Sequence, residues 1–230
     1  MERYLCFAHR GASGHEPENT LAAVVKAVDL GAHWIEVDVY AVTRELIVIH
    51  DERLDRTTSG TGYVMEKTFD HLRSLDAGKG ERIPTLREIF DAVDKKAGIN
   101  VELKGERTGG LTVSLIEEYV KKHKWTYEQF IVSSFNRREL KLVRKLNPKI
   151  RIGILIDRPR RHYARFARRY AAYSLHINVK LANARSVKRA HERGLRLFVY
   201  TVNSPEDVVR LEALGVDGIF TDFPGIVIRS

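Results

Sequence analysis

Residues 34–51 read WIEVDVYAVTRELIVIHD, and they combine two strand-like runs with a short charged break. The two runs are Trp34–Tyr40 and Leu46–His50. A parallel crossover needs about a dozen or more residues, so the second run must return antiparallel to the first as a hairpin. Centring the turn on Arg44 predicts that Asp38 pairs with His50.

The rest of the chain alternates strand-like and helix-like segments. The other predicted strands are Leu5–His9, Asn100–Lys104, Phe130–Ser134, Arg151–Ile156, Leu175–Val179, Arg196–Thr201 and Asp217–Thr221. The predicted helices are Thr20–Leu30, Leu86–Lys95, Leu111–Lys122, Arg138–Leu146, Arg160–Tyr170, Ala184–Arg193 and Pro205–Leu214. Such alternation is typical of parallel strands with right-handed helical crossovers.

Removal of the hairpin arm leaves eight strand–helix units, which predicts an α/β fold of the parallel (β/α)8 TIM-barrel type. We expect a single domain over residues 1–230. Residues 51–80 are rich in glycine, serine, threonine and charge, and we expect them to form a small insertion after the second strand.

The net charge of +9 favours anionic partners. The densest basic stretch, Arg158–Tyr170, has two interpretations. It could contact a membrane surface or nucleic acid, or it could be a solvated helix whose Tyr163, Phe166 and Tyr170 pack inward. We favour the helix. The single cysteine, the lack of a long apolar run and the lack of a recognisable leader predict a cytoplasmic protein without disulfides.

Polar residues gather at the carboxyl ends of the predicted strands, where barrel active sites lie. They include His9, Arg10, Glu36, Asp38, His50, Glu102 and Lys104. Side chains two residues apart on a strand share a face, so Glu36 and Asp38 point together while Val37 faces the helices. Three buried carboxylates need a compensating charge, and oxygen ligands suit one divalent cation, Mg²⁺ or Ca²⁺, with Mn²⁺ as a third option.

Several motifs resemble the glycerophosphodiester phosphodiesterase family. They are His9-Arg10-Gly11-Ala12-Ser13-Gly14-His15-Glu16-Pro17-Glu18-Asn19-Thr20, Glu36-Val37-Asp38-Val39, Val48-Ile49-His50-Asp51, Glu102-Leu103-Lys104, Ser134-Phe135, Thr201-Val202-Asn203 and Thr221-Asp222-Phe223-Pro224. The motifs follow the order of that family from residue 9 to residue 224, so the resemblance covers nearly the whole chain.

The resemblance implies a role for each matched residue. Metal ligands would be Glu36, Asp38 and Glu102; general acid and base would be His9 and His50; phosphate ligands would be Arg10 and Lys104; substrate-binding aromatic residues would be Phe135 and Tyr200. The family often has tryptophan where this chain has Tyr200. We interpret Asn19 mainly as a helix cap, and Glu18 as a residue that could orient a neighbouring ligand.

The implied reaction is metal-dependent hydrolysis of a small glycerophosphodiester to sn-glycerol 3-phosphate and an alcohol such as choline or ethanolamine. The nucleophile could be water or the neighbouring glycerol hydroxyl, and either histidine could be the base. One alternative is a lysophospholipase D or a phospholipase C-like enzyme on lipid phosphodiesters. Another is a basic nucleic-acid-binding module, which the acidic cluster disfavours because it would repel a polyanion. Contact with a membrane surface is not favoured either.

Overall fold

The computed structural model describes residues 4–158 and 163–228. Within them, eight parallel strands close into a barrel, because β1 bonds to both β9 and β2. The barrel strands are β1 (Leu5–Ala8), β2 (Trp34–Val42), β4 (Gly98–Leu103), β5 (Phe130–Ser134), β6 (Arg151–Ile156), β7 (Ser174–Asn178), β8 (Arg196–Tyr200) and β9 (Gly218–Thr221). The predicted TIM-barrel fold is therefore confirmed.

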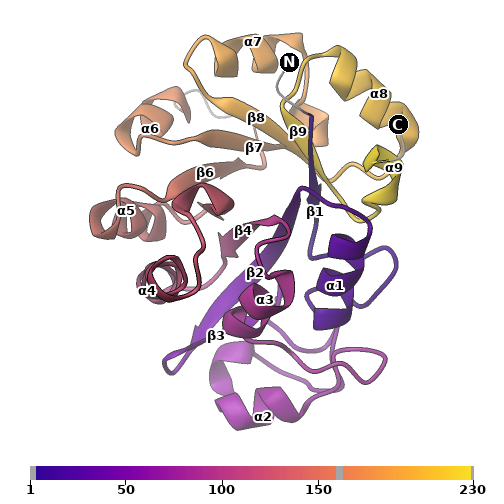
Figure 1. Ribbon diagram of the computed structural model, residues 1–230, viewed down its shortest axis with the longest axis vertical. Coiled ribbons are helices and arrows are strands. Elements are labelled where there is room, and N and C mark those ends of the chain that lie inside the picture. Colours follow the sequence, from indigo (N-terminus) through magenta and orange to yellow (C-terminus); the bar gives the residue numbers. More distant parts are fainter. Residues whose placement is uncertain (1–3, 159–162, 229–230) are drawn as a thin grey trace.

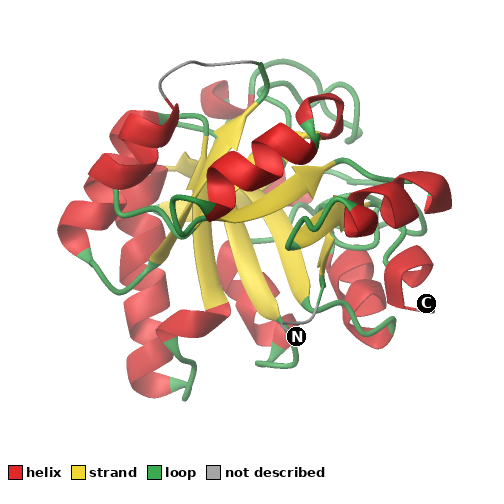
Figure 2. Cartoon of the chain, turned by 90° about the horizontal axis from the view of Figure 1, so that it is seen from above, coloured by secondary structure: helices red, strands yellow, loops and turns green. Residues whose placement is uncertain are grey.

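Helices surround the strands on the outside (Figures 1 and 2). They are α1 (Leu21–Asp29), α3 (Leu86–Val93), α4 (Thr108–Lys122), α5 (Arg137–Leu146), α6 (Tyr163–Arg169), α7 (Ala184–His191), α8 (Pro205–Ala213) and the short α9 (Gly225–Ile228). Capping residues mark where several of these helices begin. For example, Thr85 and Glu88 form a capping box at the start of α3, and Ser204 caps α8 with Pro205 in its first turn.

The two faces of each strand serve different cores. Outward-facing residues such as Val37 and Leu103 are fully or almost fully buried against the helices, as their alternation with acidic residues predicts. Inside the barrel, Phe7 packs against Phe198 and Phe220 with ring centroids 4.7 and 4.5 Å apart. This aromatic layer closes the amino-terminal part of the barrel, and the polar residues lie nearer its carboxyl-terminal end.

The strand β3 (Glu45–Val48) forms the predicted hairpin with β2, but the predicted register is wrong by one residue. Val39 pairs with Val48, and Asp38 lies opposite Ile49, whose N–H donates to the Asp38 carbonyl at 3.0 Å. The turn therefore holds two residues. Because β2 runs past its barrel neighbours, the hairpin extends beyond the rim.

Residues 51–80 form a small lobe beside the hairpin, visible with α2 (Phe69–Ser74) at the bottom of Figure 1. The 3₁₀ helix η1 (Val64–Glu66) also belongs to it. Its apolar residues make a separate cluster with the hairpin, in which Leu54 and Leu72 are fully buried against Ile47. The lobe thus has a core of its own, which fixes it over one side of the barrel rim.

The basic stretch follows the inward-packing interpretation where it is described. Tyr170 is buried, and Phe166 packs against the main core below the guanidinium of Arg137, which lies 3.4 Å from the ring centroid. Residues 159–162 and the side chain of Tyr163 lie outside the described part. Among the described residues, no helix combines the length and apolar character needed to cross a membrane.

Candidate active site

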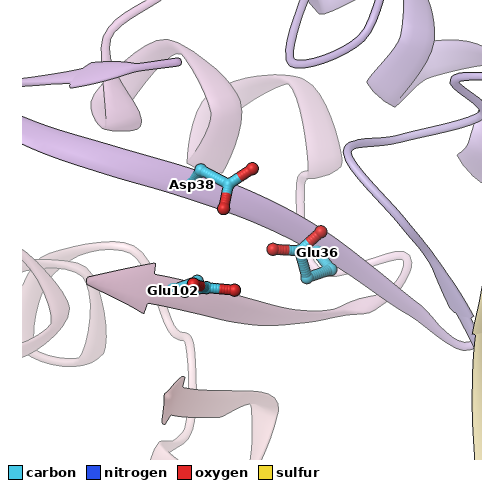
Figure 3. A group of neighbouring side chains, drawn as sticks. All are labelled: Glu36, Asp38 and Glu102. Atoms are coloured by element: carbon cyan, nitrogen blue, oxygen red, sulfur yellow. The ribbon is translucent and has the colours of Figure 1, made fainter. Parts of the chain in front are cut away.

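Three acidic side chains from two neighbouring strands meet near the rim of the barrel. Glu36 and Asp38 project from β2, and Glu102 projects from β4, as Figure 3 shows. One carboxylate oxygen from each lies within 4.8 Å of the others. Glu36 and Asp38 are 2% and 1% exposed, so water does little to screen their charges.

The acidic cluster is electrostatically unfavourable by itself. Burial, followed by the charges of Asp38 and Glu102, raises the pKa of Glu36 well above its usual range. Burial and the charge of Asp38 raise the pKa of Glu102 to about 7. In addition, the Oε1 atom of Glu36 is buried and has no hydrogen-bond partner. An unpaired buried oxygen within an all-oxygen set fits a hard divalent cation, so these residues could hold one.

Two cations partly balance this cluster. Lys104 Nζ lies 3.0 Å from Glu102 Oε1 and 3.8 Å from Asp38 Oδ1. Arg10 Nε lies 3.5 Å from Asp38 Oδ2. Burial alone would lower the pKa of Lys104, but the charges of Glu102 and Asp38 raise it. Both cations are therefore charged, and they border the acidic cluster on the side of the cavity.

A tight turn after β1 brings the backbone of Arg10 to the cluster. Arg10 and Gly11 have φ values of 57° and 78°, and the Arg10 N–H donates to Glu36 Oε2 at 2.8 Å. A Cβ atom on Gly11 would lie 2.6 Å from the backbone of Ala23, so any larger residue would push the turn away from α1. The glycine of this motif therefore keeps the turn close to the helix.

Asn19 has a different role from the predicted helix cap. Thr20 caps α1, and Asn19 instead adopts a left-handed conformation with φ 59°. Its side chain donates to Asp38 Oδ2 at 3.0 Å and accepts from the Asp38 N–H at 3.2 Å. Asn19 thus fixes the orientation of Asp38.

Each of the two candidate acid–base histidines is held by a carboxylate. His9 Nδ1 lies 2.7 Å from Asp222 Oδ1, and His50 Nδ1 lies 2.6 Å from Asp51 Oδ1. An ionised carboxylate only accepts, so each neutral ring carries its proton on Nδ1 and keeps a lone pair on Nε2. His50 Nε2 lies 3.2 Å from Lys104 Nζ, which can donate to it.

Burial lowers the pKa of His50 below its ordinary value, although the charge of Asp38 opposes the shift. For Asp222, burial raises the pKa, but hydrogen bonds from His9, Asn203 and Ser13 outweigh it and lower the pKa to about 2. Asp222 is therefore ionised at neutral pH and accepts the hydrogen bond from His9 Nδ1.

All of the predicted site residues except the buried Asp38 border one cavity of about 290 Å³ at the carboxyl-terminal end of the barrel. Its lining includes His9, Arg10, Glu36, His50, Glu102, Lys104, Phe135 and Tyr200. Phe135 is 43% exposed at the mouth, and the Tyr200 hydroxyl donates to the Ile156 carbonyl at 3.1 Å. Most of the charged groups thus lie on one side of the cavity, and aromatic rings line the other side together with Asp157.

Three residues that hold the predicted side chains were not among the predicted site residues. They are Asp51, which holds His50; Asp222, which holds His9; and Asn19, which holds Asp38. A signal existed for the first two, because each is an acidic residue directly after a strand end within a quoted motif. Asn19 carried no such signal, since an asparagine before a helix usually caps it.

The sequence pattern of the glycerophosphoryl diester phosphodiesterase family matches residues 9–226, which span the whole cavity. This chain belongs to that family. Family membership makes it a phosphoric diester hydrolase that acts on glycerophosphodiesters.

Similar proteins support the assignment over the full length. A glycerophosphodiester phosphodiesterase of Caldanaerobacter subterraneus subsp. tengcongensis is 41% identical, and the match covers 98% of this chain and 96% of that protein. One of Bacillus subtilis is 33% identical over 98% of this chain and 85% of its own length. An Oleispira antarctica phosphodiesterase, solved in complex with the product sn-glycerol-3-phosphate, superimposes with a TM-score of 0.89 at 30% identity, covering 97% of this chain and 94% of that one.

Proposed function

We propose that the enzyme hydrolyses small glycerophosphodiesters, such as glycerophosphocholine or glycerophosphoethanolamine, to sn-glycerol 3-phosphate and a free alcohol. The observation that carries the proposal is the pairing of two carboxylate-held histidines with a cluster of three carboxylates around one cavity. The product bound to the similar Oleispira antarctica enzyme supports the direction of cleavage.

The substrate phosphate would lie between the two cationic side chains of the site. Arg10 and Lys104 both line the cavity and both carry a positive charge, so they can bind the non-bridging phosphate oxygens. They also stay close to the charge that grows on those oxygens in the transition state. Glu36, Asp38 and Glu102 would hold one divalent cation, Mg²⁺, Ca²⁺ or Mn²⁺, which would supply Lewis-acid stabilisation of the same oxygens.

His9 and His50 would move the protons of the reaction. One Nε2 atom accepts a proton from the attacking hydroxyl, and the other, as an imidazolium, donates a proton to the departing alcohol oxygen. Asp222 and Asp51 hold the rings through Nδ1, which leaves the Nε2 atoms for this exchange once the Lys104 ammonium, 3.2 Å from His50 Nε2, binds the phosphate instead. Each such proton transfer contributes about 10²–10⁴-fold to the rate.

The alcohol part of the substrate would contact the aromatic side of the cavity. Phe135 and Tyr200 offer ring faces there, and Asp157, which follows β6 and pairs with Arg158 at 3.4 Å, adds a carboxylate. Ring faces and a carboxylate favour a cationic alcohol such as choline or ethanolamine.

The test is release of glycerol 3-phosphate from glycerophosphocholine. The protein is first treated with a chelator, and Mg²⁺, Ca²⁺ or Mn²⁺ is then restored separately. We expect metal-dependent release of glycerol 3-phosphate together with choline. Release of phosphocholine would overturn the proposed cleavage direction, and full activity in the chelator would remove the cation from the proposal.

A further inference from the structure

The lobe formed by residues 51–80 contacts the loop between β1 and α1 through two salt bridges. In the first, Lys79 Nζ lies 2.8 Å from Glu16 Oε2. In the second, the guanidinium of Arg56 binds Glu18. The first bridge only attaches the lobe to the loop. The residues of the second bridge, Arg56 and Glu18, also contact residues of the active site.

Arg56 uses three nitrogens of its guanidinium on two carboxylates. Its two terminal nitrogens donate to Glu18 at 2.6 and 2.8 Å, which is the parallel geometry of a bidentate pair. Its Nε donates to Asp51 Oδ2 at 2.6 Å. A lysine could not reproduce this planar fork, because its ammonium is a single point charge.

Each of these carboxylates holds a residue with a proposed role in the reaction. The other oxygen of Asp51 holds His50 Nδ1 at 2.6 Å. Glu18 Oε1 accepts from Arg10 at 2.8 Å. Arg56 is thus linked through Asp51 to His50, a candidate acid–base group. It is linked through Glu18 to Arg10, a candidate phosphate ligand.

The side chain of Arg56 does not border the catalytic cavity. It borders a separate open hollow of about 530 Å³, lined by Glu18, the hydroxyl residues 57–59 and Asp76. Its effect on the reaction therefore has to pass through Asp51 and Glu18.

We propose that Arg56 is a positioning residue that orients His50 through Asp51 and Arg10 through Glu18. The proposal rests on the proposed roles of His50 and Arg10. Without Arg56, Asp51 and Glu18 would lose the cation that they share, and Asp51 would lose the contact that fixes its rotamer. The lobe over the rim thereby becomes part of the catalytic architecture, since it carries the residue that orders both sides of the phosphate site.

The exposure of Arg56 separates this role from a structural one. Its side chain is 49% exposed, and ion pairs at such positions add little to folding stability. A small displacement of a catalytic group, in contrast, can lower a rate by about 10²-fold. Loss of Arg56 should therefore change catalysis far more than stability.

The test compares Arg56→Ala and Arg56→Lys with two matched controls. Arg53→Ala removes a similarly exposed arginine of the same lobe, which pairs with Asp55 at 3.2 Å. Lys79→Ala removes the other salt bridge between lobe and loop. We expect Arg56→Ala to lower kcat by about 10–100-fold, with unchanged metal activation and unchanged thermal unfolding. Arg56→Lys should recover only part of the loss, and both controls should behave as wild type.

A second measurement follows the histidines directly. The Nδ1 proton of His50, shared with Asp51, should give a downfield proton NMR signal that is weakened or lost in Arg56→Ala. The equivalent signal of His9 should stay, because Asp222 does not contact Arg56. Added guanidinium, but not the same concentration of sodium chloride, should restore part of kcat in Arg56→Ala.

The outcomes distinguish this proposal from the proposed function. Turnover is measured on glycerophosphocholine and on the activated diester bis(p-nitrophenyl) phosphate. If the wild type cleaves only the activated diester, the proposed substrate is wrong, while the comparison of variants and the NMR signals still test Arg56. Wild-type kcat and an unchanged His50 signal in Arg56→Ala would overturn the positioning role. An equal loss of activity in Lys79→Ala would assign the effect to docking of the lobe.

Discussion

The two sides of the cavity differ in chemistry although the same barrel builds both. The side formed by β1, β2, β4 and the residues after β3 contributes His9, Arg10, Glu36, His50, Glu102 and Lys104. The side formed by β5 to β8 contributes neutral or aromatic groups, with Asp157 as a charged exception. We propose from this difference that one side carries the bond-breaking chemistry and that the other selects the alcohol.

The largest effect should follow removal of a histidine from the charged side. His9→Ala and His50→Ala should each lower kcat by about 10²–10⁴-fold, because each removes one proton transfer. Steady-state kinetics on glycerophosphocholine measures the loss, and circular dichroism checks that the fold is kept. Near wild-type turnover in either variant would show that the reaction does not need that imidazole.

A smaller effect should follow a change in the acidic cluster that keeps its shape. Glu102→Gln preserves volume but removes one charge from the three carboxylates. The metal concentration that gives half-maximal activity should then rise at least about tenfold. Titration of the chelated enzyme with Mg²⁺ or Ca²⁺ measures it. Unchanged metal dependence would exclude Glu102 as a ligand.

On the neutral side of the cavity, His176 should make the stability of the fold depend on pH. His176 on β7 is fully buried, and burial lowers its pKa to about 3 from the ordinary value of 6.5. As pH falls below 6.5, His176 gains a proton in the unfolded chain but stays neutral in the folded chain. The free energy of unfolding therefore falls until the pH reaches the folded pKa.

Between about pH 7 and pH 5, this single group should lower the free energy of unfolding by about 2 kcal/mol. Urea unfolding at both pH values measures the change. His176→Gln removes the titrating ring, so the difference between the two pH values should shrink by a similar amount. If the variant keeps the full pH dependence of the wild type, other groups cause it.

The sequence was sufficient for the barrel and for the convergence of the site residues, but not for the hairpin register. The period of two along β2 predicted that Glu36 and Asp38 share a face, and they do. The hairpin turn instead contains Thr43 with φ 58°, a conformation that a β-branched residue seldom adopts. No glycine or asparagine marks this two-residue turn, so a three-residue turn was the natural prediction.

The residues that hold the site were harder to predict than the site itself. Asn19 and Thr20 are both good helix caps, and only tertiary structure shows that Thr20 caps α1 while Asn19 binds Asp38. The contacts of Arg56 join positions that are five and 38 residues apart in sequence. Such contacts depend on how the lobe packs on the barrel, which no local pattern encodes.

The smallest effect should come from the aromatic wall, and it should depend on the substrate. Tyr200→Ala removes a ring face, which is worth about 0.5–2 kcal/mol to a cationic alcohol, or about 2- to 30-fold in kcat/KM. Glycerophosphocholine should therefore lose more than glycerophosphoglycerol, whose alcohol is neutral. Tyr200→Phe is the matched control, because it keeps the ring and loses only the hydrogen bond to the Ile156 carbonyl.

Phe135→Ala provides a second probe on the same side, since its ring is exposed at the cavity mouth without a comparable hydrogen bond to lose. We expect a similar preference for the neutral substrate and an unchanged metal requirement. Equal losses for both substrates in Tyr200→Ala and Phe135→Ala would mean that the wall only excludes water. The two sides of the cavity would then share one task, and the choice of alcohol would have to come from Asp157 and its neighbours on β6.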